Sequence, residues 1–139
     1  MAGEGVSFEA LTRQEEIFAR AFESSTLSLA EGLYHPEVIY ISPTVRLFGW
    51  PTRIHGLRRT IEFINLTVQR VRNVRYCAVE SAIVAGGSSA FVRIHFDWDA
   101  GGRRLRSNYV VIYRYREGRI GRQELFYDPS GELEVLAGG

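Results

Sequence analysis

The last third of the chain carries the clearest pattern of apolar and polar positions. Between residues 90 and 129 the two kinds of residue alternate along three runs, which are separated by Gly-containing segments at residues 99–102 and 116–118. Alternation with a period of two is typical of strands with one buried face, and Gly at these points is typical of tight turns. The pattern therefore predicts a three-stranded meander whose apolar face packs against another element.

Apolar residues recur at helical spacing in the first half of the chain. Ser7 is a suitable N-cap for a helix that begins directly after it and whose apolar stripe includes Phe18 and Phe22. Residues 27–34 predict a short second helix, and residues 56–72 predict a long third one. Each apolar stripe needs a surface to cover, which the meander provides.

Two further strands complete the expected fold. Residues 37–43 and 74–85 have strand-like patterns, and the GGSS segment that follows the second predicts a hairpin into the meander. Residues 44–56 are rich in Gly and Pro and predict no element, although they contain Trp50. Helices followed by a run of antiparallel strands describe an α+β domain, with three N-terminal helices packed on one face of a curved antiparallel sheet.

Length and composition fit one globular domain. The chain has 139 residues, 45% of them hydrophobic and 24% charged, which suffices for a single core. We expect one domain over residues 1–139, with flexible tails at residues 1–7 and 134–139. The net charge of +1 gives no electrostatic reason to expect nucleic acid or an anionic membrane as a partner.

The remaining composition indicates a cytoplasmic protein without a metal or an organic cofactor. A single cysteine, Cys77, allows no internal disulfide, and no leader or membrane-spanning stretch is visible. Three scattered histidines have no metal-binding spacing. Gly-rich nucleotide-binding patterns are absent from the sequence.

The element order resembles the nuclear-transport-factor-2-like superfamily, together with ISP at residues 41–43, IHG at 54–56 and YRYREGRI at 113–120. Within it, the sequence is most similar to SnoaL-like polyketide cyclases, ketosteroid isomerases and limonene epoxide hydrolases. The resemblance covers residues 8–133. It implies a cone-shaped sheet with the helices on its concave face, an apolar pocket for a small substrate, and a homodimer.

The resemblance also implies which side chains face the pocket. Strand alternation then places these residues in it: Tyr40, Ser42, Phe96, Trp98, Tyr109, Val111, Tyr113, Gln123, Leu125 and Tyr127. Ketosteroid isomerases keep acidic groups where this chain has Ser42 and Val111, and a Tyr near Ala21. The epoxide hydrolases keep an Arg and two Asp at Val92, Ile94 and Leu125. Because these groups are missing, mechanisms that rely on them are not implied.

The candidate catalytic residues fall into two sets. Tyr40, Gln123 and Tyr109 could polarise a substrate carbonyl from within an apolar pocket, although half-buried tyrosines are also common in strands. His95 and Asp97 are neighbours on one strand face and could exchange a proton. Strand alternation places both side chains on the charged outer face of the sheet, unless a β-bulge turns them inward. Trp50 could close over a bound substrate or pack on a partner subunit.

Two functions remain open from the sequence. The first is a cofactor-independent cyclase, isomerase or dehydratase acting on an apolar, carbonyl-bearing molecule, with oxyanion charge stabilised by Tyr or Gln. The alternative is a non-catalytic domain of the same fold that binds a small ligand or forms dimers, which the missing carboxylates favour.

Overall fold

The first helix, α1 (Phe8–Glu23), begins where the sequence predicts it. In the computed structural model, which describes residues 5–127, Ser7 Oγ accepts a hydrogen bond from the backbone N–H of Ala10 at 3.1 Å. This bond satisfies one of the free amide donors of the first turn. Leu11 and Phe18 are buried on the face that meets the sheet, so this face fixes the helix against the strands.

Two more helical segments lie in the expected places. Residues 27–34 contain the 3₁₀ helix η1 (Leu27–Leu33), and residues 56–72 contain α2 (Leu57–Val68). Helix α2 ends earlier than expected because the chain is already extended at Arg72, the first residue of β3. The described part of the chain therefore has two α-helices, and the expected short helix is a 3₁₀ helix.

One six-stranded sheet contains all the strands that the structure describes between residues 5 and 127, in the order β2-β1-β6-β5-β4-β3. The meander is confirmed as β4 (Ser89–Ala100), β5 (Arg103–Arg116) and β6 (Arg119–Tyr127), and β3 (Arg72–Ile83) precedes it as expected. Pairing between β4 and β5 is continuous from Ser89 opposite Arg114 to Ala100 opposite Arg103. The side chains of β4 and β5 therefore alternate without interruption between the two faces.

The expectation of a wholly antiparallel sheet is wrong at one pair. Strand β1 (Tyr34–Ile41) runs parallel to β6, with Tyr40 opposite Gln123. A parallel pair needs a long connection, and here everything from β2 to β5 supplies it. This pairing places the C-terminal half of β1 beside the end of the meander.

The segment at residues 44–56, expected to lack elements, contains two short ones. The 3₁₀ helix η2 (Pro43–Phe48) has Pro in its first turn and ends at Gly49, whose φ is 75°, a value that favours glycine. Strand β2 (Arg53–His55) then pairs with β1. Elements of this length are too short to show a periodic pattern, which is why the sequence does not reveal them.

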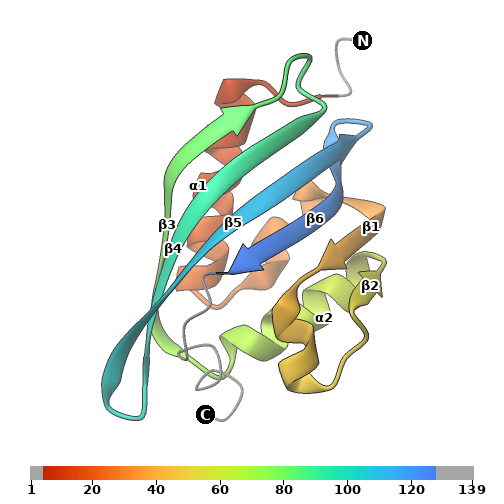
Figure 1. The fold of residues 1–139 in the computed structure, drawn as a ribbon. Helices are drawn as coiled ribbons and strands as arrows, with labels where there is room; N and C mark the ends of the chain where they lie inside the picture. Colours follow the sequence, from red (N-terminus) through yellow and green to blue (C-terminus); the bar gives the residue numbers. More distant parts are fainter. Residues whose placement is uncertain (1–4, 128–139) are drawn as a thin grey trace.

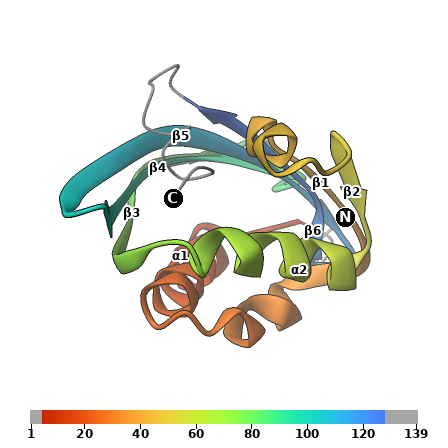
Figure 2. The ribbon, with the colours of Figure 1, turned by 90° about the horizontal axis from the view of Figure 1, so that it is seen from below.

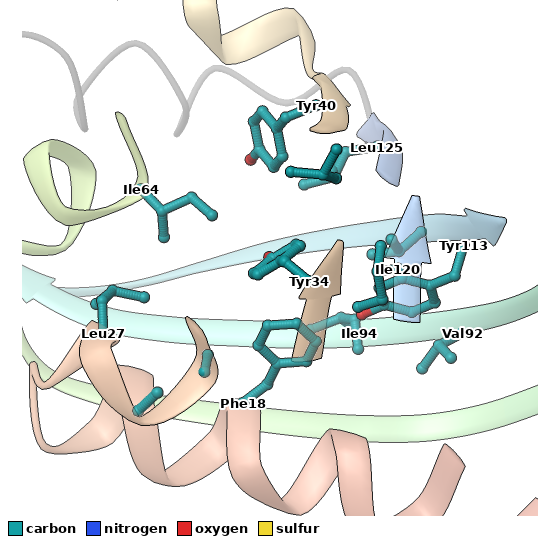
Figure 3. Packing of buried hydrophobic residues seen from close by; sticks show 14 of the residues in the cluster. Phe18, Leu27, Tyr34, Tyr40, Ile64, Val92, Ile94, Tyr113, Ile120 and Leu125 are labelled. Carbon is teal, nitrogen blue, oxygen red and sulfur yellow. The ribbon is translucent and has the colours of Figure 1, made fainter. Parts of the chain in front are cut away.

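The sheet arches over α1 and α2, which both lie on its concave side (Figure 2). Figure 1 shows the long β4–β5 hairpin extending past the helices at one end. The main core fills the space beneath the arch, where Phe18 of α1 meets Tyr34 and Tyr113 of the sheet (Figure 3). No helix within residues 5–127 is long and apolar enough to cross a membrane.

Of the expected tails, residues 1–4 and 134–139 lie outside the described residues. The backbone N–H of Val6 donates to the Gly87 carbonyl at 2.7 Å, so the chain just before α1 contacts the β3–β4 turn.

Candidate functional site

A cavity lies under the arch, between the concave face of the sheet and the two α-helices. The cavity has a volume of about 50 Å³, which is room for a few water molecules. Its lining is mostly aromatic and aliphatic with a few polar groups, the composition typical of small-molecule sites. The lining residues are Phe18, Phe22, Tyr40, Thr44, Phe63, Ile64, Thr67, Tyr76, Phe96, Trp98, Ser107, Tyr109, Val111, Gln123, Leu125 and Tyr127.

Most of the residues expected to face a pocket do line this cavity. From the sheet they are Tyr40, Phe96, Trp98, Tyr109, Val111, Gln123, Leu125 and Tyr127. They come together because alternate residues of β4, β5 and β6 share the concave face, and because the parallel pairing adds β1. The structure thus gathers both polar candidates, Tyr40 and Gln123, on neighbouring strands.

Three expected residues are placed elsewhere. Ser42 is buried, but its hydroxyl is 2.8 Å from Thr44 Oγ1 and accepts from the Thr44 N–H at the start of η2. Trp50 packs edge-on against Phe63, with the Arg59 guanidinium 4.6 Å from its ring centre. Tyr113 is fully buried and stacks on Phe18. These side chains support the cavity wall from behind and are not part of its lining.

His95 and Asp97 lie on the convex face of the sheet. They alternate with Ile94 and Trp98, which are buried on the concave side, and the continuous β4–β5 register contains no bulge that would turn them inward. Asp97 pairs with Arg106 at 2.7 Å across the strands. The geometry therefore separates these two side chains from the cavity.

Gln123 has a fixed orientation in the cavity wall. The Tyr34 hydroxyl donates to Gln123 Oε1 at 2.6 Å, and both side chains are buried. This bond directs the Gln123 amide NH₂ group away from Tyr34. Another lining residue, Trp98, has a buried indole N–H with no hydrogen-bond partner within residues 5–127. An unpaired buried donor costs about 1–3 kcal/mol.

The cavity phenols are donors and not bases. Burial raises the pKa of Tyr40 and Tyr109 well above the ordinary value of 10, and the neighbouring Tyr127 raises both further. Burial also raises the pKa of Tyr127, to about 12. Each hydroxyl therefore stays protonated throughout the physiological pH range and can donate a hydrogen bond to a ligand oxygen.

One buried acid was not expected from the sequence. Glu15 of α1 is only 7% exposed. Its Oε1 accepts from the Tyr76 hydroxyl at 2.5 Å, and its Oε2 accepts from the Gln14 amide at 3.0 Å. Burial raises the pKa of the Glu15 carboxyl above 4.5, and the polar groups of Tyr76, Gln14 and Tyr113 oppose part of that rise. Through Tyr76 this carboxyl is one hydrogen bond away from the cavity lining.

The sequence patterns do not single out Tyr76, Thr44 or Glu15, for different reasons. Tyr76 alternates with exposed neighbours on β3, and its buried state could have been read from that alternation. Thr44 belongs to a segment in which no element was expected. Glu15 had a usable signal, because it occupies the same helical stripe as Leu11 and Phe18, where a charged residue is out of place.

The described residues do not suggest a metal site. Within residues 5–127 no three His, Cys, Asp or Glu side chains come together in a way that could hold a metal ion. The cavity lining in this part of the chain contains neither a carboxylate nor a histidine. What the arrangement offers chemically is an apolar enclosure with several neutral hydrogen-bond donors.

Comparison with known proteins gives a family and a set of relatives. The family model described as SnoaL-like domain matches residues 15–123. An uncharacterised PhzA/B-like protein of Pseudomonas aeruginosa is 30% identical over 108 residues, which cover 76% of this chain and 75% of that protein.

Solved structures show the same fold at lower identity. A putative isomerase from Bacillus subtilis superposes with a TM-score of 0.74 at 18% identity, over 88% of each chain. An LEH-like epoxide hydrolase from M. tuberculosis superposes with a TM-score of 0.66 at 19% identity, over 91% of this chain and 89% of the other. At these identities the likeness establishes the fold alone. Any argument about function must therefore come from the residues of the cavity.

Proposed function

Because this chain belongs to the SnoaL-like domain family, we propose that it is a cofactor-independent enzyme acting on a small, apolar, carbonyl-bearing molecule. The observation that carries the proposal is the cavity, in which Tyr40, Tyr109 and Gln123 offer neutral donors among aromatic walls. The reaction is of the isomerase, cyclase or dehydratase type, and these types share an enol or enolate intermediate.

The proposed mechanism relies on enclosure and on hydrogen bonds to oxygen. In a low-dielectric cavity, donors aimed at a developing oxyanion stabilise the transition state more than they do in water. We assign this task to the Tyr40 hydroxyl and the Gln123 amide, with Tyr109 beside them. The apolar walls hold the substrate in a reactive conformation. Since no base lines the cavity within residues 5–127, water or a group of the substrate takes up the proton.

The test is exchange of α-protons for deuterium in a panel of small ketones, followed by proton NMR in D₂O. We expect the protein to accelerate exchange for at least one ketone. The Tyr40→Phe and Gln123→Leu variants should each lose about 10²–10³-fold of that rate, the usual effect of removing one oxyanion donor. Gln69→Leu, an exposed site at the end of α2, is the control and should retain it. Unchanged rates in both cavity variants would show that the assigned roles are wrong.

A second candidate function is binding without catalysis. The specific observation in its favour is the absence of any carboxylate or histidine from the described lining. Mass spectrometry of the purified protein should then reveal a retained ligand, and that ligand should be recovered unchanged after incubation in D₂O. Exchange of its α-protons would instead favour the enzyme.

We also propose that the protein forms a homodimer through the convex face of the sheet. Phe91 and Phe126 are 43% and 51% exposed there, and the strand register places Val110 between Arg93 and Phe126. The same face carries charges of both signs, such as Asp97 and Arg106. A patch with exposed aromatics and charges of both signs is suited to pairing with its own copy.

A further inference from the structure

Glu15 is a buried acid to which the proposed chemistry assigns no task. It is only 7% exposed, and burying a carboxyl is unfavourable unless its oxygens are hydrogen-bonded or it keeps a proton. Its two oxygens have different partners. Oε1 accepts from Tyr76, which lines the cavity, and Oε2 accepts from Gln14, which does not. One oxygen of the carboxyl is therefore hydrogen-bonded to a residue of the cavity lining.

The Gln14 side chain is held in one orientation by a further hydrogen bond. The Tyr115 hydroxyl donates to Gln14 Oε1 at 2.8 Å, so the Gln14 NH₂ group must point toward Glu15. Gln14 therefore donates to Glu15 Oε2. Because a carbonyl oxygen accepts a hydrogen bond better than a carboxyl O–H does, we infer that a proton on Glu15 is carried by Oε1, next to the Tyr76 oxygen. Hydrogen bonds thus connect Tyr76, Glu15, Gln14 and Tyr115 in a row. Gln14 and Tyr115 also line a surface groove beside Arg13, so this row of hydrogen bonds ends near solvent.

We propose that a proton on Glu15 determines whether the Tyr76 hydroxyl donates to Glu15 or to a carbonyl oxygen of a ligand in the cavity. This inference rests on the proposed function, because it requires that the cavity binds a carbonyl-bearing molecule. It adds Glu15 as a positioning residue that acts through Tyr76. Tyr76 becomes a further donor beside Tyr40 and Gln123.

The protons balance in both states. When Glu15 is ionised, Tyr76 O–H donates to Oε1 across the 2.5 Å contact, and its hydrogen is unavailable to the cavity. When Glu15 is protonated, the carboxyl O–H on Oε1 donates to the Tyr76 oxygen, and the Tyr76 hydrogen turns toward the ligand. Tyr76 keeps its own proton throughout, and one proton enters from solvent on Glu15. Ligand binding and protonation of Glu15 therefore strengthen each other.

The surroundings of Glu15 favour the neutral form. Burial raises its pKa, and the groups that face it from the sheet are phenols: Tyr34 of β1, Tyr76 of β3, and Tyr109, Tyr113 and Tyr115 of β5. No arginine or lysine within residues 5–127 is among the groups that shift its pKa.

The coupling between Glu15 and Tyr76 is testable without a ligand. Carbon-13 NMR of protein labelled at Glu Cδ and Tyr Cζ should show the Glu15 carboxyl titrating above pH 4.5, with the Tyr76 Cζ resonance moving at the same midpoint. Glu15→Gln should abolish the movement of Tyr76, whereas Glu16→Gln, an exposed neighbour on the same helix, should preserve it. A Tyr76 Cζ chemical shift that stays constant while Glu15 titrates would overturn the inference.

The ligand experiment uses a matched pair of small probes. Cyclopentanone has a carbonyl oxygen that can accept a hydrogen bond, and methylenecyclopentane has a CH₂ group in its place. Binding is followed by shifts of cavity resonances across a pH series. We expect cyclopentanone to bind about 3- to 10-fold more weakly as pH rises through the Glu15 midpoint, the worth of about one hydrogen bond. Methylenecyclopentane should show no change. In Glu15→Gln, cyclopentanone should bind with the low-pH affinity at every pH, because the Gln amide donates to Tyr76 as the protonated acid does.

The two proposals fail in different ways. If neither probe binds at any pH, the cavity does not accept such molecules and the proposed function fails with this inference. If both probes bind and cyclopentanone shows no pH dependence, the inference alone is wrong. A Tyr76→Phe variant in which cyclopentanone still loses affinity with rising pH would also overturn it.

Discussion

Glu15 shows how a single residue departs from the pattern around it. Leu11 and Phe18 share its helical stripe and are almost fully buried, so the helix carries Glu15 into the interior with them. Phenols of the sheet, Tyr76 and Tyr113 among them, interact with the carboxyl there. Such a site is maintained against the cost of desolvation, which is the physical reason to expect a task for it.

This burial predicts a specific pH dependence of stability. Because the pKa of Glu15 in the folded protein lies above 4.5, the folded state binds the proton more tightly than the unfolded state does. Its contribution to stability is fully present below about pH 4.5 and is lost as pH rises through the folded-state pKa. Glu15→Gln should remove this loss, so the variant becomes more stable relative to the parent as pH increases. Urea denaturation at a series of pH values measures the difference.

The exposed neighbour provides the control for that series. Glu16→Gln changes the same charge on the same helix but alters no buried group, so its stability should follow the parent at each pH. A Glu15→Gln variant that also follows the parent would show that Glu15 titrates normally in the folded protein.

At the scale of single elements, α1 depends on its first turn. Ser7 Oγ caps the Ala10 amide at 3.1 Å, and the helix carries Leu11, Glu15 and Phe18 into the interior. Ser7→Ala should lower the free energy of unfolding by about 0.5–2 kcal/mol. Ser28→Ala, an exposed serine of η1, should have a smaller effect. Thermal or urea unfolding compares the two, and equal effects would argue against the cap.

The elements differ in how much the sequence reveals of them. The meander and α1 are predicted closely because alternation, Gly turns and a Ser N-cap are local signals. The parallel β1–β6 pair is not predicted, because no local pattern records which edge a distant strand joins. Helix η2 and strand β2 are also missed, because they are shorter than the window over which a period is visible.

The site follows the same division. Strand alternation assigns Tyr40, Tyr109 and Gln123 to one face, since a period of two fixes the face of every residue once one is known, and all three line the cavity. Tyr76 and Glu15 each have a local signal of burial, but their contact depends on how α1 crosses β3, which only tertiary packing decides. The sequence also could not show that Trp50 packs against Phe63, because that contact joins the 44–56 segment to α2.

At the scale of the whole molecule, the two faces of the sheet have separate tasks in the proposed function. The concave face is covered by helices and encloses the cavity, whereas the convex face exposes Phe91 and Phe126. If the convex face forms the homodimer, the two cavities face away from the interface and remain open to ligand. Dimerisation would then stabilise the arch without taking part in catalysis.

The dimer leads to a prediction about mass in solution. Light scattering coupled to size exclusion should give twice the chain mass of 15.8 kDa for the parent, and a single chain for Phe126→Lys. A lysine at this position would be an unpaired charge in an apolar contact, which is strongly unfavourable. Leu29→Lys is a matched control, because Leu29 is also 51% exposed but lies on η1, so this variant should remain dimeric. A parent that elutes as a single chain would rule out the proposed interface, and it would leave the cavity and its chemistry to be tested in a monomer.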